Sequence, residues 1–274
     1  MEKKLSTERY THGHHSSVVE QHRQRTAEEA AAFFLPELKN DMKLLDFGCG
    51  PGSITVGFSK YLSDGEITGI DIAPEILEQA KELATTSNVS NIKFETGNVY
   101  DLNYPDNHFD AAYGHQVLQH LQHPIEALKE IKRIVKPGGI IAVRDADYGT
   151  MVHSPLDPVL QHWLEVYHAV ASHNGAEADA GRNLYPWLID SGFRDIKMSS
   201  STWTFYKQRQ VLNWGDSWAE RSTKSEFAKQ AVEYQIATQS ELESIANAWR
   251  SWARKPNAFF SFIHVEGLAY VSRS

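Results

Sequence analysis

The glycine-rich segment Asp46–Gly52, with the sequence DFGCGPG, has residue types and spacing that indicate ligand chemistry. Glycines let a backbone turn sharply and approach a ligand without a clash from a Cβ atom. A helix is expected to start directly after this segment, and the free N–H groups at a helix N-terminus attract a negatively charged group. The segment therefore predicts a loop that binds the anionic part of a nucleotide-like ligand.

The spacing of the glycines distinguishes two such ligands. Glycines stand at 48, 50 and 52, whereas a dinucleotide fingerprint requires Gly or Ala at the position of Ser53. Asp46 ends the preceding predicted strand, and a carboxylate there would repel a pyrophosphate. S-adenosyl-L-methionine (SAM) instead offers an ammonium and a sulfonium beside its carboxylate. The pattern favours SAM and disfavours a dinucleotide-dependent oxidoreductase.

Asp71 follows the next predicted strand, about 20 residues after the loop, where an acid can accept hydrogen bonds from both ribose hydroxyls. This position fits either ligand. A glycine loop alone could be a helix-capping turn of no function. Its place between a strand and a helix, together with Asp46 and Asp71, favours a binding site instead.

The segments around these residues alternate in character. Short apolar runs predict strands at 43–47, 66–70, 91–96, 109–114 and 140–144. Helical spacing predicts helices at about 17–35, 53–62, 75–84 and 124–135. Strands that alternate with such helices imply right-handed crossovers and a mostly parallel sheet with helices on both faces. The sequence therefore predicts an α/β fold.

The second half of the chain differs in texture. A helix is expected from Pro158, and a short one that closes at Gly192. A long strand at 193–206, three helices near 208–221, 225–235 and 239–254, and a last strand at 259–272 complete the chain. We expect the helices after Tyr206 to be an insertion before the last strand. The predicted organisation is a lid and helix at 1–39, a cofactor-binding core at 40–147, and a helical cap with the final strands at 148–274.

The composition of the chain narrows the classes of molecule that it is expected to bind. The chain has 274 residues and a formal charge of −8, which argues against a protein that grips nucleic acid through its phosphates. Cys49 is the only cysteine, so the chain can form neither an intrachain disulfide nor a cysteine-based metal site, and we expect no metal. The first fifteen residues lack the apolar core of a signal peptide, and no apolar run approaches the roughly 20 residues of a membrane span. We expect a cytoplasmic protein without membrane or nucleic-acid partners.

Four segments together resemble the successive motifs of class I SAM-dependent methyltransferases: LLDFGCGPG, GIDIAPEILEQAKE, FETGNVYDLNYPDNHFDAAYGHQVLQH and ALKEIKRIVKPGG. The chain is most similar to the broad group that includes the ubiquinone/menaquinone biosynthesis methyltransferases. The resemblance covers about residues 43–145. It implies SAM as methyl donor, S-adenosyl-L-homocysteine (SAH) as product, and a Rossmann-like sheet whose last strand runs antiparallel.

The resemblance also implies roles at the methionine and ribose ends of SAM. Asp46, Gly48 and Gly50 would line the methionine end, and Cys49 would contribute its backbone. Asp71 would hold the ribose.

The resemblance places Ile72 against the adenine. The motif that usually reads Gly-Asp-Ala is here Gly97-Asn98-Val99. The side-chain oxygen of Asn98 can still contact the adenine amino group, although the amide carries no charge.

Other parts of the site follow from the same resemblance. His115 and Gln116 come after the fourth strand, where the family places residues near the sulfonium and the methyl group. The N-terminal segment looks like a lid that folds over SAM, with Tyr10 and His14 as expected contacts. A frayed tail is the alternative for that segment.

Methyl transfer is an in-line displacement at the sulfonium carbon, so the protein mainly aligns the reactants. A general base is needed only when the nucleophile arrives protonated and weakly acidic. His115 is the best-placed candidate for a base or an orienting residue. His120 and His123 are expected to be surface or loop residues, since no acid or cysteine beside them supports a metal site. Asp145 and Asp147, placed after the fifth strand, are either bases or chain caps.

Aromatic residues concentrate after residue 150. Trp214, Trp218 and Arg221 fall on one helical face, and Trp203 lies in the long predicted strand. Core packing is the simpler explanation for any one tryptophan. The functional interpretation is an aromatic acceptor pocket in which Arg221 contacts an anionic group.

The sequence as a whole predicts a SAM-dependent methyltransferase of a small molecule, as a monomer or homodimer, with O-, N-, C- or S-methylation open. One alternative is an RNA or protein methyltransferase. The acidic balance and the tryptophan-rich second half disfavour it, and the lack of an Asn/Asp-Pro-Pro-aromatic motif after the fourth strand counts against methylation of a nucleic-acid base. A non-catalytic SAM-binding protein is the other alternative.

Overall fold

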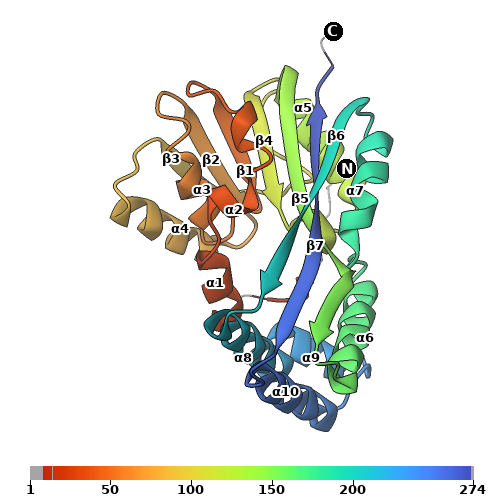
Figure 1. The fold of residues 1–274 in the computed structure, drawn as a ribbon. Helices are drawn as coiled ribbons and strands as arrows, with labels where there is room; N and C mark the ends of the chain where they lie inside the picture. Colours follow the sequence, from red (N-terminus) through yellow and green to blue (C-terminus); the bar gives the residue numbers. More distant parts are fainter. Residues whose placement is uncertain (1–8, 14, 273–274) are drawn as a thin grey trace.

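A seven-stranded mixed sheet forms the centre of the computed structural model, which describes residues 9–13 and 15–272 (Figure 1). The strand order is β3-β2-β1-β4-β5-β7-β6. Neighbouring strands pair in parallel, except that β7 runs antiparallel to both β5 and β6. The predicted Rossmann-like α/β fold with an antiparallel last strand is confirmed. The strands are β1 (Lys43–Phe47), β2 (Glu66–Asp71), β3 (Ile92–Thr96), β4 (Phe109–His115), β5 (Val135–Ser154), β6 (Asp195–Phe205) and β7 (Phe259–Tyr270).

Helices cover both faces of the sheet because successive strand residues point to opposite sides. Leu44 packs in one core with α2 (Ala27–Ala30) and α3 (Ser53–Phe58). Leu45, the next residue, packs in a second core with α5 (Pro124–Ile134) and α7 (Ala180–Asp190). Further along the sheet, α4 (Pro74–Thr86) packs beside β3 through Leu77, Ala80 and Phe94.

The single helix predicted from Ser17 to Leu35 is wrong. Helix α1 covers Ser16–Arg23, α2 starts only at Ala27, and a short 3-10 helix, η1, covers Leu35–Glu37. Thr26 has an extended backbone, and its side chain accepts a hydrogen bond from Glu29 N at 3.2 Å. Threonine is favoured at such a helix start over a helix interior, so the helical spacing across this point is misleading.

Strand β5 is longer than predicted. The sequence predicts an end at Arg144, but β7 pairs with β5 as far as Ser154, opposite Phe259. Asp145 and Asp147 therefore lie inside a paired strand, not after it. Asp145 Oδ1 accepts the Gln119 N–H at 3.1 Å, and Asp147 Oδ1 binds Arg182 Nη2 at 2.6 Å. Both acids anchor neighbouring segments to the strand.

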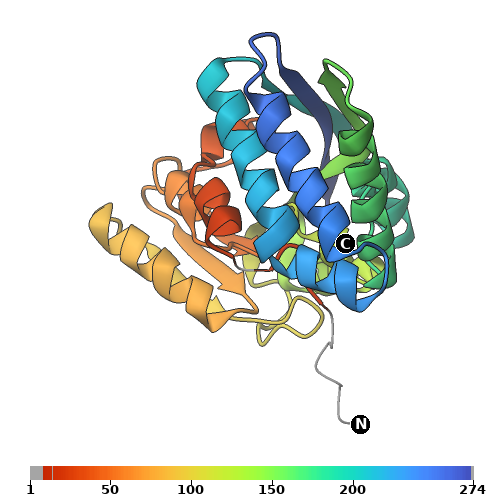
Figure 2. The same cartoon turned by 90° about the horizontal axis from the view of Figure 1, so that it is seen from below.

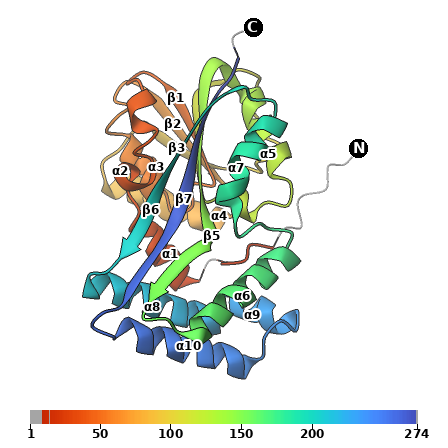
Figure 3. The ribbon, with the colours of Figure 1, turned by 45° about the vertical axis from the view of Figure 1, so that its right-hand side comes forward.

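Four further helices gather beyond the end of β5 and form a cap, which Figure 1 and Figure 3 show below the sheet. Seen from below in Figure 2, α8 and α10 lie side by side. The cap core is aromatic: the Trp163 ring lies 4.4 Å from that of Trp218 and 4.9 Å from that of Trp249. The cap helices are α6 (Pro158–His173), α8 (Gln208–Lys224), α9 (Glu226–Glu233) and α10 (Gln239–Ala253).

Among residues 9–13 and 15–272, no helix is both long enough and apolar enough to cross a bilayer.

Replacement of Trp249 tests whether the cap is a packed unit. Its ring is fully buried among Trp163, Trp252 and Phe260. Trp249→Ala removes these contacts and leaves a cavity, so the free energy of unfolding should fall by about 3–5 kcal/mol in urea denaturation. Tyr206→Ala, at a side chain that is 63% exposed, should change it by less than about 0.5 kcal/mol. Equal effects of the two variants would contradict a packed cap.

Candidate active site

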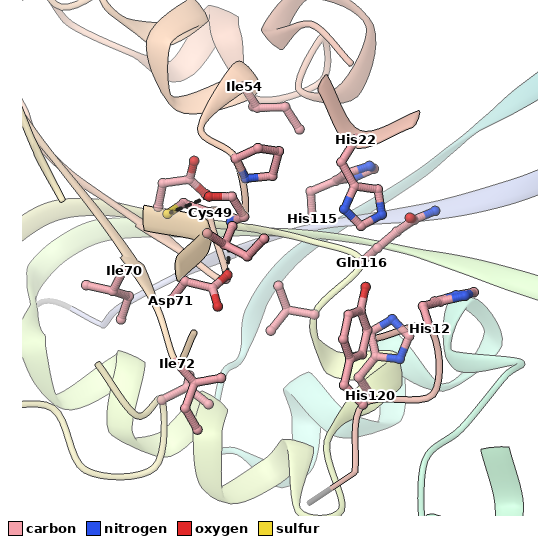
Figure 4. Close-up of a pocket in the computed structure, with 18 of the residues that line it drawn as sticks. His12, His22, Cys49, Ile54, Ile70, Asp71, Ile72, His115, Gln116 and His120 are labelled. Atoms are coloured by element: carbon pink, nitrogen blue, oxygen red, sulfur yellow. Dashed lines mark hydrogen bonds between the residues drawn. The ribbon is translucent and has the colours of Figure 1, made fainter. Parts of the chain in front are cut away.

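One cavity of about 220 Å³ lies where β1, β2 and β4 end. The strand order reverses between β1 and β4, and ligands of open α/β sheets bind at such a point, outside the carboxyl ends of the strands. The N-terminal segment and the short 3-10 helix η2 (Leu118–His120) close the other side. Figure 4 shows Cys49 and Asp71 on one side of the cavity and His22, His115 and His120 on the other.

Most of the predicted cofactor residues meet in this cavity. His14 lies outside the described residues. The predicted residues that line the cavity are Tyr10, Asp46, Gly48, Cys49, Gly50, Asp71, Ile72, Asn98, Val99, His115 and Gln116.

The glycine loop takes a backbone shape that other residues rarely adopt. Gly48 has a φ of 67°, and a Cβ atom there would lie 2.5 Å from Val117 Cγ2. Gly50 has a φ of 53°, and a Cβ atom there would meet nothing within 4 Å. The Cys49 side chain is buried, and its N–H donates to Ile70 O at 2.9 Å. The loop is therefore held against the end of β2 while Gly50 faces open space.

Asp71 joins the loop to the end of β2. Its Oδ2 accepts the Gly50 N–H at 3.0 Å, and its Oδ1 accepts the Ala73 N–H at 3.1 Å. The carboxylate still lines the cavity, since each oxygen carries more than one lone pair.

Ile72, next to Asp71, and the segment 98–99 form an apolar and a polar part of the cavity wall. Ile72 is an apolar side chain that is 56% exposed. Asn98 Oδ1 accepts the Tyr100 N–H at 3.0 Å, and Val99 lines the cavity next to it. This combination can cover a flat heterocycle and contact its polar edge.

Asp46 is a buried acid beneath the loop. It is 3% exposed, and its Oδ2 accepts a hydrogen bond from Thr55 Oγ1 at 2.6 Å. Burial raises the pKa of Asp46 to about 7, against the lowering effect of the Thr55 hydroxyl and with a smaller rise from the charge of Asp71. A carboxylate desolvated in this way is stabilised by a cation placed beside it.

His115, the last residue of β4, is a neutral hydrogen-bond donor. Arg144 Nη1 lies 3.5 Å from its Nδ1, and arginine can only donate, so the ring proton sits on Nε2. Nε2 has no hydrogen-bond partner among residues 9–13 and 15–272. Burial lowers the pKa of His115 well below 6.5, and the charges of Arg25 and Arg144 lower it further. The ring is a poor base because its protonated form would lie buried beside two guanidinium groups.

Gln116 connects the N-terminal segment to β5 and β7 through hydrogen bonds. It has a φ of 56°, and its N–H donates to Arg144 O at 2.7 Å. Its Oε1 accepts from Arg25 Nη2 at 2.7 Å, so its Nε2 faces His264 Nε2, 2.8 Å away. His264 must then accept at Nε2 and carry its proton on Nδ1.

Sequence reasoning missed several residues of the cavity wall. His12, His22 and Arg25 line it, and no spacing or motif distinguishes them in the sequence. Arg25 lies within the helix that was wrongly predicted from Ser17 to Leu35, so its position at a helix break was not predicted. The sequence predicts His120 and His123 to be surface or loop residues. His120 instead lines the cavity, because η2 turns it inward, whereas His123 is exposed.

The residues predicted to bind the acceptor do not line the cavity. Trp214 and Trp218 are 5% and 0% exposed within the cap core. Arg221 donates to Gln21 Oε1 at 2.6 Å and lies over the Trp218 ring. Trp203 packs behind the cavity wall, with its ring 4.4 Å from that of His264. Core packing, and not an acceptor pocket, therefore describes Trp214 and Trp218. The aromatic content of the sequence could not distinguish these two explanations.

Comparison with known proteins identifies the family. The family model described as "Methyltransferase domain" matches residues 38–193. An uncharacterised methyltransferase of Schizosaccharomyces pombe is 34% identical over 260 residues, which are 92% of each chain. A demethylmenaquinone methyltransferase of Staphylococcus aureus is 32% identical over 158 residues, which are 57% of this chain and 62% of that protein. A solved phosphoethanolamine N-methyltransferase 2 of Haemonchus contortus, in complex with phosphomonomethylethanolamine and SAH, has a TM-score of 0.53 and 16% identity over 90% of this chain and 52% of that chain.

The chain therefore belongs to the class I SAM-dependent methyltransferases, and the predicted resemblance is confirmed. Its methyl donor is SAM. The cavity fits this ligand, because the buried Asp46 offers a negative partner for a cationic group and Gly50 leaves room for a close approach. Among the described residues, no group of three or more His, Cys, Asp or Glu side chains could hold a metal ion.

The raised pKa of Asp46 predicts a pH-dependent affinity for SAH. Protonated Asp46 cannot attract the ligand's ammonium, so affinity should rise as the pH increases through about 7, by up to about tenfold per pH unit below that value. Calorimetric titrations between about pH 6 and pH 7.5 measure this. Asp46→Asn should bind more weakly with a flat profile. Thr55→Val removes the hydrogen bond that lowers the pKa, so its transition should move to higher pH. A flat wild-type profile would contradict the assignment.

Proposed function

We propose that the protein transfers the methyl group of SAM to a small-molecule acceptor. The supporting observation is the enclosure of the cavity by the N-terminal segment. Thr11 and His12 are 1% and 4% exposed because they lie between the cavity and the cap. The side chain of Asn174, at the end of α6, donates to Thr11 Oγ1 at 3.0 Å and fixes the segment there. A protein or RNA acceptor would need an open groove instead.

The cofactor residues divide into two groups in this proposal. Asp71 binds the ribose hydroxyls, and Ile72, Asn98 and Val99 surround the adenine. The glycine loop and Asp46 bind the methionine end. This arrangement points the sulfonium toward the end of β4, where His115 and Gln116 stand.

SAM supplies an activated methyl group on a positively charged sulfur. The chain aligns the acceptor with it. His115 orients the acceptor by donating from Nε2, and it is not the base, because its Nδ1 already accepts from Arg144 and its protonation is disfavoured. His115 therefore positions the acceptor without taking a proton from it.

A variant series at Asp71 tests the cofactor contacts. Asp71→Ala should weaken SAH binding at least about tenfold in calorimetry, because it loses the ribose acceptor and releases the Gly50 N–H. Asp71→Asn keeps one acceptor oxygen and should lose less. Asp216→Ala, at an acid on the cap surface paired with Arg254, is the matched control and should bind as the wild type does. Unchanged affinity in Asp71→Ala would exclude the ribose contact.

The acceptor class is tested with methyl-labelled SAM and a cell extract separated by size. Label in the small-molecule fraction is expected. Label only in the protein or RNA fraction would overturn the proposal. SAH binding without any labelled product would favour a non-catalytic SAM-binding protein.

A further inference from the structure

A row of polar side chains crosses four neighbouring strands of the sheet and ends at the cavity. His115 of β4 lies opposite Arg144 of β5, and Arg144 lies opposite Glu266 of β7. Ser199 of the edge strand β6 completes the row opposite Glu266. Residues that lie directly opposite each other on neighbouring strands point to the same face of a sheet. The four side chains therefore form one line from the edge of the sheet to His115.

The charges of this row are paired inside the protein. His115, Arg144 and Glu266 are all buried. Arg144 Nε donates to Glu266 Oε1 at 3.3 Å, so the two opposite charges offset each other. Glu266 Oε2 accepts from Ser199 Oγ at 2.7 Å. The Ser201 hydroxyl bridges the ion pair, because it donates to Glu266 Oε1 and accepts from Arg144 Nη2 at 3.0 Å.

These contacts direct the remaining nitrogen of Arg144 toward His115. Nε and Nη2 are held by Glu266 and Ser201, while Nη1 lies 3.5 Å from His115 Nδ1. A guanidinium group is planar and rigid, so two nitrogens held by acceptors fix the direction of the third. The ring of His115 is thereby held with Nδ1 as an acceptor. Its Nε2–H has no partner in the part of the chain that the structure describes, and the residue lines the cavity.

The charge balance of the row suits a cationic cofactor. Burial lowers the pKa of His115 well below 6.5, and the charges of Arg25 and Arg144 lower it further. A neutral ring adds no positive charge beside a sulfonium. Glu266 offsets the charge of Arg144, so the residue that orients the ring does not add a net charge either.

We propose that Arg144 and Glu266 are positioning residues for methyl transfer, because their ion pair holds the His115 ring as a neutral donor whose Nε2–H binds the methyl acceptor. Ser199 and Ser201 hold the carboxylate of Glu266 in place. This inference rests on the proposed function, since it requires an acceptor beside His115. The competing explanation is that the ion pair only stabilises the sheet, and the experiment separates the two.

The test uses the full chain saturated with SAH and the double variant Arg144→Met/Glu266→Gln. Both charges are removed together, so no unpaired charge remains in the sheet and the fold should persist. Nitrogen NMR of protein with isotope-labelled histidine reports where each ring carries its proton, and His115→Gln assigns the signal. Between about pH 6 and pH 8 the wild type should show one neutral form of His115, with the proton on Nε2. The double variant should show both neutral forms in exchange and should take up a proton at a higher pH.

The rate of methyl transfer is the second measurement. Label should pass from methyl-labelled SAM to the small-molecule fraction of a cell extract at least about tenfold more slowly in the double variant. Its calorimetric affinity for SAH should stay within about threefold of the wild type, because neither residue lines the cavity. Arg144→Lys keeps the ion pair and a donor without the rigid fork, so it should recover part of the rate.

Arg182→Gln is the matched control. It removes an arginine that is also paired with a buried acid of β5, Asp147, but does not line the cavity or contact His115. It should change neither the His115 signal nor the rate.

An unchanged His115 signal in the double variant would overturn the inference, and so would an unchanged rate. A slower rate with an unchanged signal would also overturn it, because the pair would then not act through His115. If the double variant does not fold, Ser199→Ala/Ser201→Ala keeps the ion pair but removes the hydroxyls that hold it; it should shift the signal in the same direction by less, and an unchanged signal would again overturn the inference. A wild type that binds SAH but labels no small molecule would contradict the proposed function, which is a separate result.

Discussion

The two hydrogen bonds that Asp71 accepts from the Gly50 and Ala73 N–H groups connect the glycine loop to the end of β2. The loop needs such a connection because Gly48, Gly50 and Gly52 all have positive φ values, a conformation that helix and strand hydrogen bonds do not stabilise. The parallel pairing of β1 with β2 brings the two segments to the same edge. The same carboxylate therefore shapes the loop and lines the cavity.

The charged groups of the cavity wall come from different elements. Asp46 and Asp71 lie where β1 and β2 end, and Arg25 lies in the bend between α1 and α2. That bend is held against the start of α3, because Ser53 Oγ donates a hydrogen bond to His22 O at 2.8 Å. The N-terminal segment therefore brings a guanidinium group to a cavity whose acids belong to the sheet.

The cap contributes to the cavity wall indirectly, through the N-terminal segment that packs against it. Its tryptophans pack against one another, while the cavity wall itself comes from the N-terminal segment laid over the cap. His12 Nε2 lies 2.9 Å from the Tyr167 hydroxyl and 3.3 Å from that of Tyr148. These buried contacts, with the Asn174–Thr11 bond, fix the segment over the cavity, so cap packing positions residues of the cavity wall without supplying them.

The sequence by itself determined the strands and the glycine-loop side of the cavity. Strand periodicity, the glycine spacing, Asp46 and Asp71 are local features, since each residue acts close to where its strand ends. The rest of the cavity wall was decided by the tertiary structure. Arg25 acquires its place from a helix break at Thr26, His120 from a 3-10 turn, and Gln116 from contacts with segments as distant as His264. The extension of β5 also depended on a partner strand more than a hundred residues away. Such long-range contacts leave no periodic signal along the chain, because their spacing is set by packing and not by the repeat of a helix or strand.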